Sequence, residues 1–258
     1  MTHRIGLLGY GRIGTDLADR IRAAPDTELA YVYVRSPKPE IDEPQLTAPD
    51  ELADHPVDLV VEAATPDVLA ELAEPILDAS DLLALSGSAF AARDVEQRLT
   101  ELATASDHDL YLPHAALFGI DGLVDAREAL ESVHIEARKA PDHLDFEYAD
   151  AVDPDTIEGE TVLYEGPTRG LCQRFPRNFN SHAAMALAGL GLDDTSSRLI
   201  ADPEQESATH VITATGPGFE LEAVRDSAIE GVTGDYTLVS TWGSVRRVLK
   251  ADDGLRFL

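Results

Sequence analysis

The chain contains a single cysteine, Cys172, among its 258 residues. One cysteine cannot form an intrachain disulfide, and a zinc site built from several cysteines is also excluded. No sequence signature of a cysteine nucleophile surrounds Cys172, so a small buried or partly buried thiol is the favoured interpretation.

Basic residues are also scarce. Twenty lysines and arginines face 48 aspartates and glutamates, so the formal net charge is −28, and only three of the basic residues are lysines. This charge would repel a phosphate backbone, so we expect no nucleic-acid partner. The acids are scattered along the chain, and molar salt shortens the range of their mutual repulsion to about 3 Å. The composition therefore indicates adaptation to a salt-rich cytoplasm, as in halophilic archaea.

Long hydrophobic runs are absent, and no apolar stretch approaches the roughly 18 residues of a membrane span. The first expected strand begins almost at once, without the charged and then apolar leader of a secretory signal. We therefore expect a cytoplasmic protein that does not contact a membrane. Hydrophobic residues make up 44% of the chain, which is enough for a core, and the length suits one large domain or two modest ones.

The first part of the chain alternates between two periodicities, those of buried strands and of amphipathic helices. This alternation predicts an α/β fold, an N-terminal Rossmann domain with a doubly wound, mostly parallel sheet and right-handed crossovers. Strands are expected at 4–10, 28–34, 57–64, 81–86 and 109–116, and helices at 12–24, 66–79 and 92–107.

After about residue 117 strands and helices no longer alternate regularly, and the pattern predicts a C-terminal α+β domain with a mostly antiparallel sheet. We assign 1–117 plus 234–258 to a dinucleotide-binding domain and 118–233 to a substrate, catalytic and oligomerisation domain. Strands are expected at 133–140, 160–166, 196–203, 208–216 and 219–224, helices at 176–192 and 236–250, and a surface loop or a short helix with loops at 141–159.

The stretch GYGRIG, residues 9–14, fits the pattern G-x-G-x-x-G. Gly9 would allow the tight turn, Gly11 would let a pyrophosphate approach the backbone, and Gly14 would let helix and strand pack closely. The motif follows an expected strand and opens an expected helix, which is the context that supports dinucleotide binding over a structural turn. Arg12 and Ile13, between the glycines, are assigned to the same cofactor site.

The end of the second expected strand bears on the choice of cofactor. An acidic residue at this point usually binds the ribose 2′-hydroxyl of NAD, but this chain has Arg35, Ser36 and Lys38. A guanidinium and a hydroxyl would favour a 2′-phosphate, so we expect NADP(H), in preference to NAD(H). The alternative is that these are ordinary surface residues and that both cofactors bind.

Five stretches, taken in their order along the chain, resemble L-aspartate dehydrogenases over nearly the whole length. They are GYGRIG, VVEAATPDVLAELAEPIL (60–77), SGSAFA (86–91), YEGPTRGLCQRFPRNFN (164–180) and RLIADPEQESATHVI (198–212). The resemblance implies an enzyme that transfers hydride from the amino-bearing carbon of L-aspartate to a nicotinamide. The product, iminosuccinate, hydrolyses to oxaloacetate and ammonia or supplies pyridine-nucleotide synthesis.

The resemblance also implies roles for particular residues. His210 matches the catalytic histidine of the family, and an imidazole, which titrates near neutrality, can accept a proton from an amine or activate water. Asn178 and Asn180 match the start of a helix where amides could bind a substrate carboxylate, unless one of them merely caps the helix. Ala64 and Ser86, within the matched stretches, are assigned to the cofactor site.

Three departures from the family pattern fall near these residues. Ala208 stands where the family has an asparagine, residues 114–121 differ from its Ser-Gly-Ala-Ile-Gly-Gly-Leu-Asp, and residues 234–238 replace its Asn-Pro-Lys-Thr-Ser. His114 and His182 lie next to matched motifs. Either both are incidental or they belong to a remodelled substrate pocket, and for His114 the position at the end of an expected strand favours the pocket.

Two other functions stay open from the residues. One is a related oxidoreductase acting on another small acidic substrate, and the other is a dinucleotide-binding paralogue without catalysis. No acids have metal-ligand spacing with the histidines, so we expect no metal site. By fold-level analogy, one face of the second sheet would make a homodimer.

Overall fold

The computed structural model describes residues 2–149, 152–231 and 233–250. The chain divides into two compact units. The first comprises Met1–Ala89, Arg93–Pro113 and Leu238–Leu258, and the second Phe90–Ala92 and His114–Thr237.

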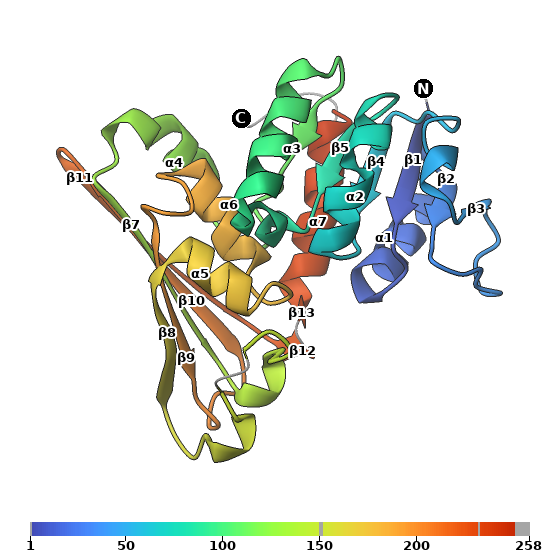
Figure 1. Cartoon of the computed structure of the whole chain (residues 1–258). Coiled ribbons are helices and arrows are strands. Elements are labelled where there is room, and N and C mark those ends of the chain that lie inside the picture. Colours follow the sequence, from blue (N-terminus) through green and yellow to red (C-terminus); the bar gives the residue numbers. More distant parts are fainter. Residues whose placement is uncertain (1, 150–151, 232, 251–258) are drawn as a thin grey trace. The chain divides into compact units, whose positions relative to one another are not determined.

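The first unit is built on a six-stranded, wholly parallel sheet with the order β3-β2-β1-β4-β5-β6 (Figure 1). This order confirms the expected doubly wound Rossmann fold, in which the direction of winding reverses between β1 and β4. The strands are β1 (His3–Leu8), β2 (Thr27–Tyr33), β3 (Gln45–Leu46), β4 (Leu59–Glu62), β5 (Asp81–Ala84) and β6 (Leu110–Tyr111).

Both faces of this sheet are buried, as expected where crossover helices return the chain to the start of the next strand. Leu59 and Val61 of β4 belong to a core that also contains Val245, whereas Val60, between them, faces the other way and is equally buried. The helices of this unit are α1 (Arg12–Ala23), α2 (Pro66–Leu77), α3 (Arg93–Ala105) and most of α7 (Asp235–Val248), with 3₁₀ turns at Pro49–Glu51 and Gly87–Ala91.

One strand of this unit is shorter than the sequence suggests. We expected a strand over 109–116, but β6 ends at Tyr111. Pro113 has no N–H for a ladder, and Ala115 and Ala116 have φ angles of 44° and 67°, which end the extended backbone in a turn. The chain therefore reaches His114 in a loop and not in a strand.

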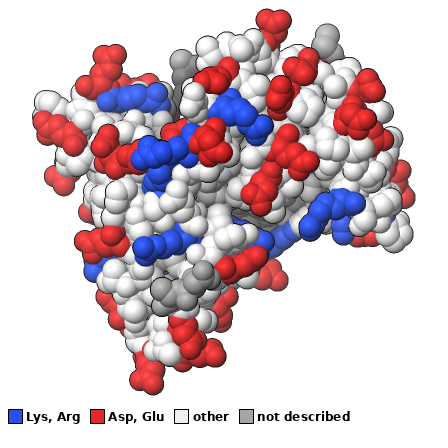
Figure 2. All heavy atoms as spheres, viewed as in Figure 1, with Lys and Arg blue, Asp and Glu red and all other residues white. Residues whose placement is uncertain are grey.

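The surface bears out the scattering of the acids along the sequence. Figure 2 shows aspartates and glutamates distributed over the visible face, interspersed with fewer basic side chains. Within the described ranges, no helix combines the length and the apolarity that crossing a bilayer would need.

The second unit contains a five-stranded sheet with the order β11-β10-β7-β9-β8. Every neighbouring pair is antiparallel except β7 and β9, so the sheet is mostly antiparallel, as expected. Its strands are β7 (Ser132–Lys139), β8 (Thr161–Pro167), β9 (Ser196–Ala201), β10 (Ala208–Gly216) and β11 (Phe219–Ser227), and β12 (Ile229–Glu230) pairs separately with β13 (Thr233–Gly234).

The single helix expected over 176–192 is wrong in its bounds. The observed helix, α6 (Asn180–Ala188), begins four residues after Pro176 and ends at Ala188. A separate helix that was not expected, α5 (Thr168–Arg174), ends before Pro176, which has no N–H to continue a helix. Residues 120–126 form a further helix, α4 (Ile120–Ala126), that the sequence did not indicate. Short 3₁₀ turns occupy Arg127–Ala129, Pro141–His143 and Pro154–Thr156, the last two inside the expected loop region.

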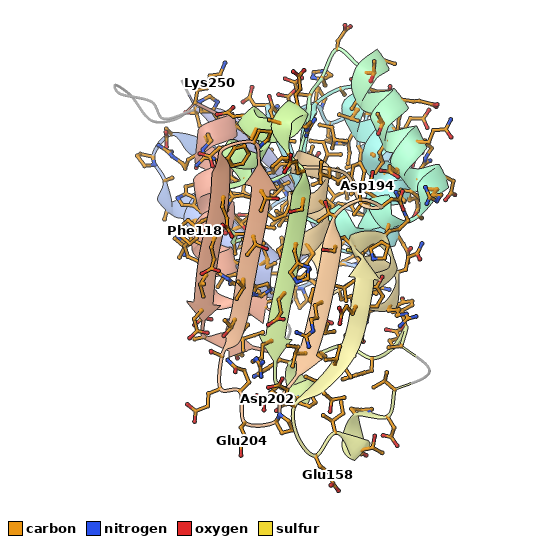
Figure 3. The ribbon with its side chains drawn as sticks, turned by 90° about the vertical axis from the view of Figure 1, so that its left-hand side faces the viewer. Phe118, Glu158, Asp194, Asp202, Glu204 and Lys250 are labelled. Atoms are coloured by element: carbon orange, nitrogen blue, oxygen red, sulfur yellow. The ribbon has the colours of Figure 1, made fainter. Side chains whose placement is uncertain are left out.

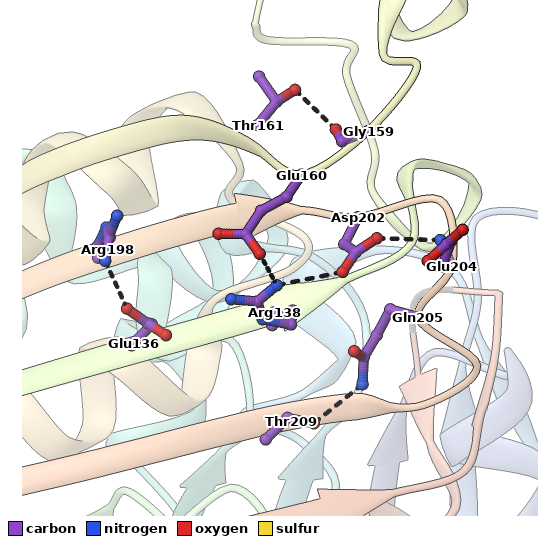
Figure 4. Close-up of polar contacts among 10 residues, drawn as sticks. All are labelled: Glu136, Arg138, Gly159, Glu160, Thr161, Arg198, Asp202, Glu204, Gln205 and Thr209. Atoms are coloured by element: carbon purple, nitrogen blue, oxygen red, sulfur yellow. Dashed lines mark hydrogen bonds and ion pairs between the residues drawn. The ribbon is translucent and has the colours of Figure 1, made fainter.

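The two faces of this sheet differ in chemistry. One face is covered by helices, with Val133, Ile135 and Ile212 packed against Met185 of α6. Among the described residues of this unit, no helix covers the other face, which Figure 3 views directly. Its half-exposed side chains form polar ladders that include the ion pairs of Arg138 with Glu160 and with Asp202, drawn in Figure 4.

Candidate functional site

The glycine loop lies between β1 and α1 and has no room for side chains at two of its three glycines. Gly9 has a φ of +87°, and a Cβ there would lie 2.6 Å from the carbonyl oxygen of Ala63. A Cβ at Gly14 would lie 2.4 Å from the carbonyl oxygen of Gly9. Both distances are below any normal contact, so these glycines are needed for the turn and for the approach of α1 to β1.

Gly11 is different, because a Cβ built there would meet no atom within 4 Å. Gly11 is the N-cap of α1 and has no side chain that could accept a hydrogen bond from the first helical N–H groups, and a helix N-terminus of this kind favours an anion. Arg12 and Ile13 are the first residues of that helix and are half-buried. An open space in front of a helix N-terminus fits the pyrophosphate of a dinucleotide.

This difference makes Gly11→Ala an informative substitution. The variant should fold, because the new methyl group meets no neighbouring atom, but this group would occupy the space that a pyrophosphate needs. We therefore expect the Kd for NADPH to rise about 10–100-fold. Fluorescence titration with NADPH measures this, and thermal melting checks the fold. Gly122→Ala is the matched control, because a Cβ at Gly122 also meets nothing within 4 Å. Unchanged NADPH binding by Gly11→Ala would contradict the assignment of the loop.

Glu62, at the end of β4, organises two further segments of the candidate cofactor site. Its carboxylate is fully buried and accepts hydrogen bonds from the Ala64 N–H at 2.7 Å and from the Ser86 N–H and hydroxyl, each at 2.9 Å. Burial raises the pKa of this carboxyl group, and the three donors oppose that shift. Sequence reasoning missed Glu62, although one acid at the end of an otherwise apolar strand was a signal for it.

Arg35 and Ser36 follow β2 after one further residue, Val34, and are exposed. They lie beyond the carboxyl end of a parallel strand, which is where open α/β sheets bind ligands. Lys38 is less available, because its Nζ lies 3.7 Å from a carboxylate oxygen of Glu40. No acidic residue occupies positions 35–38.

A second cluster of chemistry-bearing side chains lies in the other unit, on the covered face of its sheet. His210 of β10 is 2% exposed, and its ring centroid is 5.6 Å from that of His182, which is fully buried on α6. The Nδ1 atom of His182 lies 3.1 Å from the Ser197 hydroxyl of β9. The structure therefore brings together His210 and His182, two of the residues that the sequence indicated.

Two basic residues that the sequence analysis did not single out complete this cluster. Arg225 is the direct cross-strand partner of His210 and donates a hydrogen bond to its Nδ1 atom. Lys139, the last residue of β7, is 3% exposed, and its Nζ lies 5.2 Å from the ring centroid of Phe179. Both occupy positions of their strands that face the covered side of the sheet, where the other side chains are mostly apolar. A charged residue at such a position was the signal that could have found them.

The buried histidines are neutral in this environment. Burial, the nearby charges of Arg225 and Lys139, and the neighbouring His182 hold the pKa of His210 well below its usual value. Burial and the charge of Lys139 lower the pKa of His182 in the same way. Because the Arg225 guanidinium is the donor, the Nδ1 atom of His210 is the acceptor, and the ring proton is on Nε2. The arrangement can exchange protons and hold an anion.

The remaining candidates are two asparagines and a histidine of the second unit. Asn178 is buried, and its amide accepts a hydrogen bond from the Asp145 N–H and donates one to the His143 carbonyl oxygen, so both ends of the side chain hold a loop. Asn180 is half-buried at the first position of α6, and His114 is half-buried in the loop that follows β6.

Cys172 is fully buried on α5, and burial raises the pKa of its thiol to about 12. A thiol with this pKa is not a nucleophile at neutral pH. Among the described residues, no three His, Cys, Asp or Glu side chains gather in a way that could hold a metal ion.

The strand order and glycine loop of the first unit, followed by an α+β unit with two buried histidines, are the architecture of two-unit dehydrogenases of the Rossmann class. Residues 9–113 match the family model for the NAD-binding domain of homoserine dehydrogenase, and residues 121–248 match that for the C-terminal part of aspartate dehydrogenase.

Similar proteins match both units. L-aspartate dehydrogenase of Nitrosopumilus maritimus is 33% identical over 247 residues, which cover 87% of this chain and 89% of that relative. L-aspartate dehydrogenase of Methanococcoides burtonii is 32% identical over 227 residues, 83% of each chain. The crystal structure of aspartate dehydrogenase from Thermotoga maritima has the same fold, with a TM-score of 0.79 over the full length of both chains at 23% identity.

The chain therefore belongs to the aspartate dehydrogenase family. It is an oxidoreductase whose first unit is a domain for a nicotinamide dinucleotide.

Proposed function

We propose that the protein oxidises L-aspartate with a nicotinamide dinucleotide, producing iminosuccinate, which hydrolyses to oxaloacetate and ammonia. The observation that carries this proposal is the cluster of buried His210, buried Lys139 and half-buried Arg225, in a chain whose relatives named L-aspartate dehydrogenase match both units. Two cations on one buried face complement a substrate with two carboxylates. An imidazole that is kept neutral provides a base for its ammonium group.

Each residue of the proposed site has a separate task. The loop of Gly9, Gly11 and Gly14 holds the pyrophosphate, and Glu62 fixes the backbone of Ala64 and the side chain of Ser86 beside it. The bound nicotinamide supplies the acceptor for the hydride that leaves the substrate α-carbon.

The second unit would carry out the proton transfers. His210 takes a proton from the substrate ammonium, so the nitrogen lone pair can form the imine as the hydride leaves. The same group then assists the water that releases ammonia. The burial of His210 and His182 keeps bulk water from competing for this proton.

We further propose that NADP(H) is preferred. Support comes from the exposed guanidinium of Arg35 and hydroxyl of Ser36 at the end of β2, where an acid would instead favour the free ribose hydroxyl of NAD. Lys38 contributes less to this preference, because its Nζ atom lies 3.7 Å from a carboxylate oxygen of Glu40.

One experiment tests substrate and cofactor together. The purified protein, in molar KCl, is mixed with NADP⁺ or NAD⁺ and with a panel of amino acids, and reduced nicotinamide is followed by its absorbance. We expect turnover on L-aspartate and a higher kcat/KM with NADP⁺. Turnover on another acidic amino acid alone would reassign the substrate, and binding without turnover on any would reject catalysis. Equal or tighter binding of NADH than NADPH would reject the cofactor preference.

The assembly and setting of the protein are also proposals. We infer a homodimer formed through the uncovered face of the β7–β11 sheet, where the exposed Val224 pairs across strands with Val211. The excess of 28 negative charges supports a salt-rich cytoplasm as its setting, and iminosuccinate made there would be available to pyridine-nucleotide synthesis. Sedimentation in molar KCl tests the assembly, and a monomer at micromolar concentration would contradict it.

A further inference from the structure

Two basic side chains lie on the covered face of the second sheet, and Asp226, whose charge acts on Arg225, accepts its hydrogen bonds from Ser207 and Thr209 instead. Arg225 enters this face from β11 and Lys139 from the end of β7. Burial and the charge of Arg225 lower the pKa of Lys139 to about 7, and burial lowers the pKa of Arg225. Among the described residues, no carboxylate forms an ion pair with either of them.

This lack of a partner is unusual for the chain. Arg169, which is 7% exposed, pairs with Asp193 at 2.8 Å, and Arg246 pairs with Asp26 at 2.7 Å. Burying a cation costs several kcal/mol unless an anion or good hydrogen bonds compensate it. With 48 acids in the sequence, a compensating carboxylate was readily available, so its absence here points to an anion that comes from outside the protein.

The hydrogen bonds of Arg225 show where such an anion would act. One terminal nitrogen donates to Nδ1 of His210, and Nε is buried with no hydrogen-bond partner. The guanidinium therefore occupies the lone pair that His210 would use as a base, while one of its own donors is unused. A carboxylate can accept two parallel hydrogen bonds from such a fork, which the imidazole nitrogen cannot do.

We infer that Arg225 binds a carboxylate of the substrate and, in the ligand-free protein, masks the Nδ1 lone pair of His210, so that substrate binding itself releases the base. The inference deepens the proposed function and rests on it for the reaction, although the anion site stands on contacts alone. Lys139 provides a second cation for the other carboxylate. Arg225 is thus both a substrate-binding residue and a gate on proton transfer.

As a consequence, the site would select ligands with carboxylates at the binding step, before the reaction begins. A bound amine without a carboxylate would leave the guanidinium on His210, and the proton of its ammonium group would have no acceptor. A dicarboxylate engages both cations and sets the lone pair of Nδ1 free. No bond is made or broken in this step, because only hydrogen bonds are exchanged.

The test uses succinate, a dicarboxylate that lacks the amino group and cannot be oxidised at that position. Calorimetry measures its binding to the protein with and without NADP⁺. We expect Arg225→Gln to raise the Kd for succinate about 10–100-fold, the loss expected for one charge-assisted pair. Arg198→Gln is the matched control, since Arg198 lies on β9 of the same sheet but on the uncovered face, where it binds Glu136. It should bind succinate as the wild type does.

A second readout follows the base directly. In protein labelled with ¹⁵N-histidine, the Nδ1 resonance of His210, assigned by its loss in His210→Asn, is expected to shift when succinate is added. The same resonance in Arg225→Gln should already be displaced and should not respond to succinate. If Arg225 had only a structural role, the His210 resonance of Arg225→Gln would respond to succinate as that of the wild type does.

The outcomes separate this inference from the proposed function. If Arg225→Gln binds succinate as tightly as the wild type, or if succinate leaves the His210 resonance of the wild type unmoved, the inference is wrong even when aspartate is oxidised. If succinate binding depends on Arg225 but aspartate is not a substrate, the anion site stands and the proposed reaction fails. Circular dichroism of Arg225→Gln checks its fold, and Arg225→Lys, which keeps the charge but not the fork, should restore part of the affinity.

Discussion

Replacement of His210 by asparagine is expected to lower kcat for aspartate oxidation by about 10²–10⁴-fold, the range for loss of a general acid or base. Asparagine retains a polar, planar side chain of similar size, so the covered face of the sheet should stay packed. The variant cannot take the ammonium proton, and the imine cannot form as the hydride leaves. Binding of NADPH should be unchanged, because His210 belongs to the second unit and the glycine loop to the first.

The measurement is steady-state turnover of aspartate, with His134→Asn as the matched control. His134 lies on β7 of the same sheet, and its Nδ1 atom bonds to the Ser196 hydroxyl. Its position alternates with the buried Val133 and Ile135, so it belongs to the uncovered face. We expect near-normal kcat from this control. A His210→Asn variant within about threefold of the wild type would exclude His210 as the base.

The environment of His210 also predicts a pH profile. Arg225, Lys139 and His182 are the charged or titratable groups that lower its pKa, so the neutral base persists below pH 6.5. The acid limb of kcat/KM due to His210 should therefore lie below the ordinary histidine value. That limb should be absent from the residual activity of His210→Asn. A limb at or above pH 6.5 that disappears in the variant would contradict the burial argument.

Replacement of Lys139 by methionine is expected to stabilise the protein by about 2–4 kcal/mol at pH 6 and to weaken succinate binding. Methionine has nearly the same shape as lysine but carries no charge, so the substitution removes the cost of burying one. In the folded protein the pKa of Lys139 is about 7, and in the unfolded chain it takes its ordinary value of 10.5. Below pH 7 the lysine is charged in both states, and the full cost of burying the charge is present.

Above pH 7 the folded and unfolded states differ in the protonation of Lys139. The folded state has released its proton, whereas the unfolded state keeps it up to pH 10.5. The unfolded state thus binds more protons, so the contribution of Lys139 to the free energy of unfolding becomes more favourable as pH rises from 7 to 10.5. The advantage of Lys139→Met should accordingly be largest at pH 6 and should shrink by pH 10.

Urea unfolding of wild type and Lys139→Met at these two pH values checks the prediction. Lys38→Met is the matched control, since Lys38 is 41% exposed and only 3.7 Å from Glu40, and we expect it to change stability by less than about 0.5 kcal/mol. A loss of stability in Lys139→Met at pH 6, or a gain of equal size at both pH values, would show that Lys139 is not a buried charge held for a ligand.

Local sequence patterns anticipated the elements whose geometry depends on neighbours along the chain. The glycine loop could be found because its turn, its helix start and its close packing are imposed by three residues within six positions, and the structure places all three as that logic requires. The strands of the second sheet could be found because side chains alternate between its faces, as in β10. The bounds were wrong where a proline fell inside an expected element, as at Pro113, or at its start, as at Pro176.

The contacts of the candidate site could not be found in this way. Asn178 matched a motif, but both ends of its amide are engaged by the loop at His143 and Asp145, more than 30 positions away. Glu62 reaches Ser86 across two neighbouring strands that are joined through a helix. Arg225 meets His210 only because β10 and β11 pair in one register, and a shift by one residue would turn the guanidinium to the other face.

By itself, the sequence therefore determined the class of fold, the position of the dinucleotide loop, the family and the excess of acidic charge, because each depends on composition or on spacing along a short stretch. Tertiary structure alone decided which charges are buried together. It placed Lys139, His182, His210 and Arg225 on one covered face, where among the described residues no carboxylate forms an ion pair with either cation. The reason is physical: the free energy of a charge depends on its burial and its neighbours, and both are settled only when distant strands and helices pack.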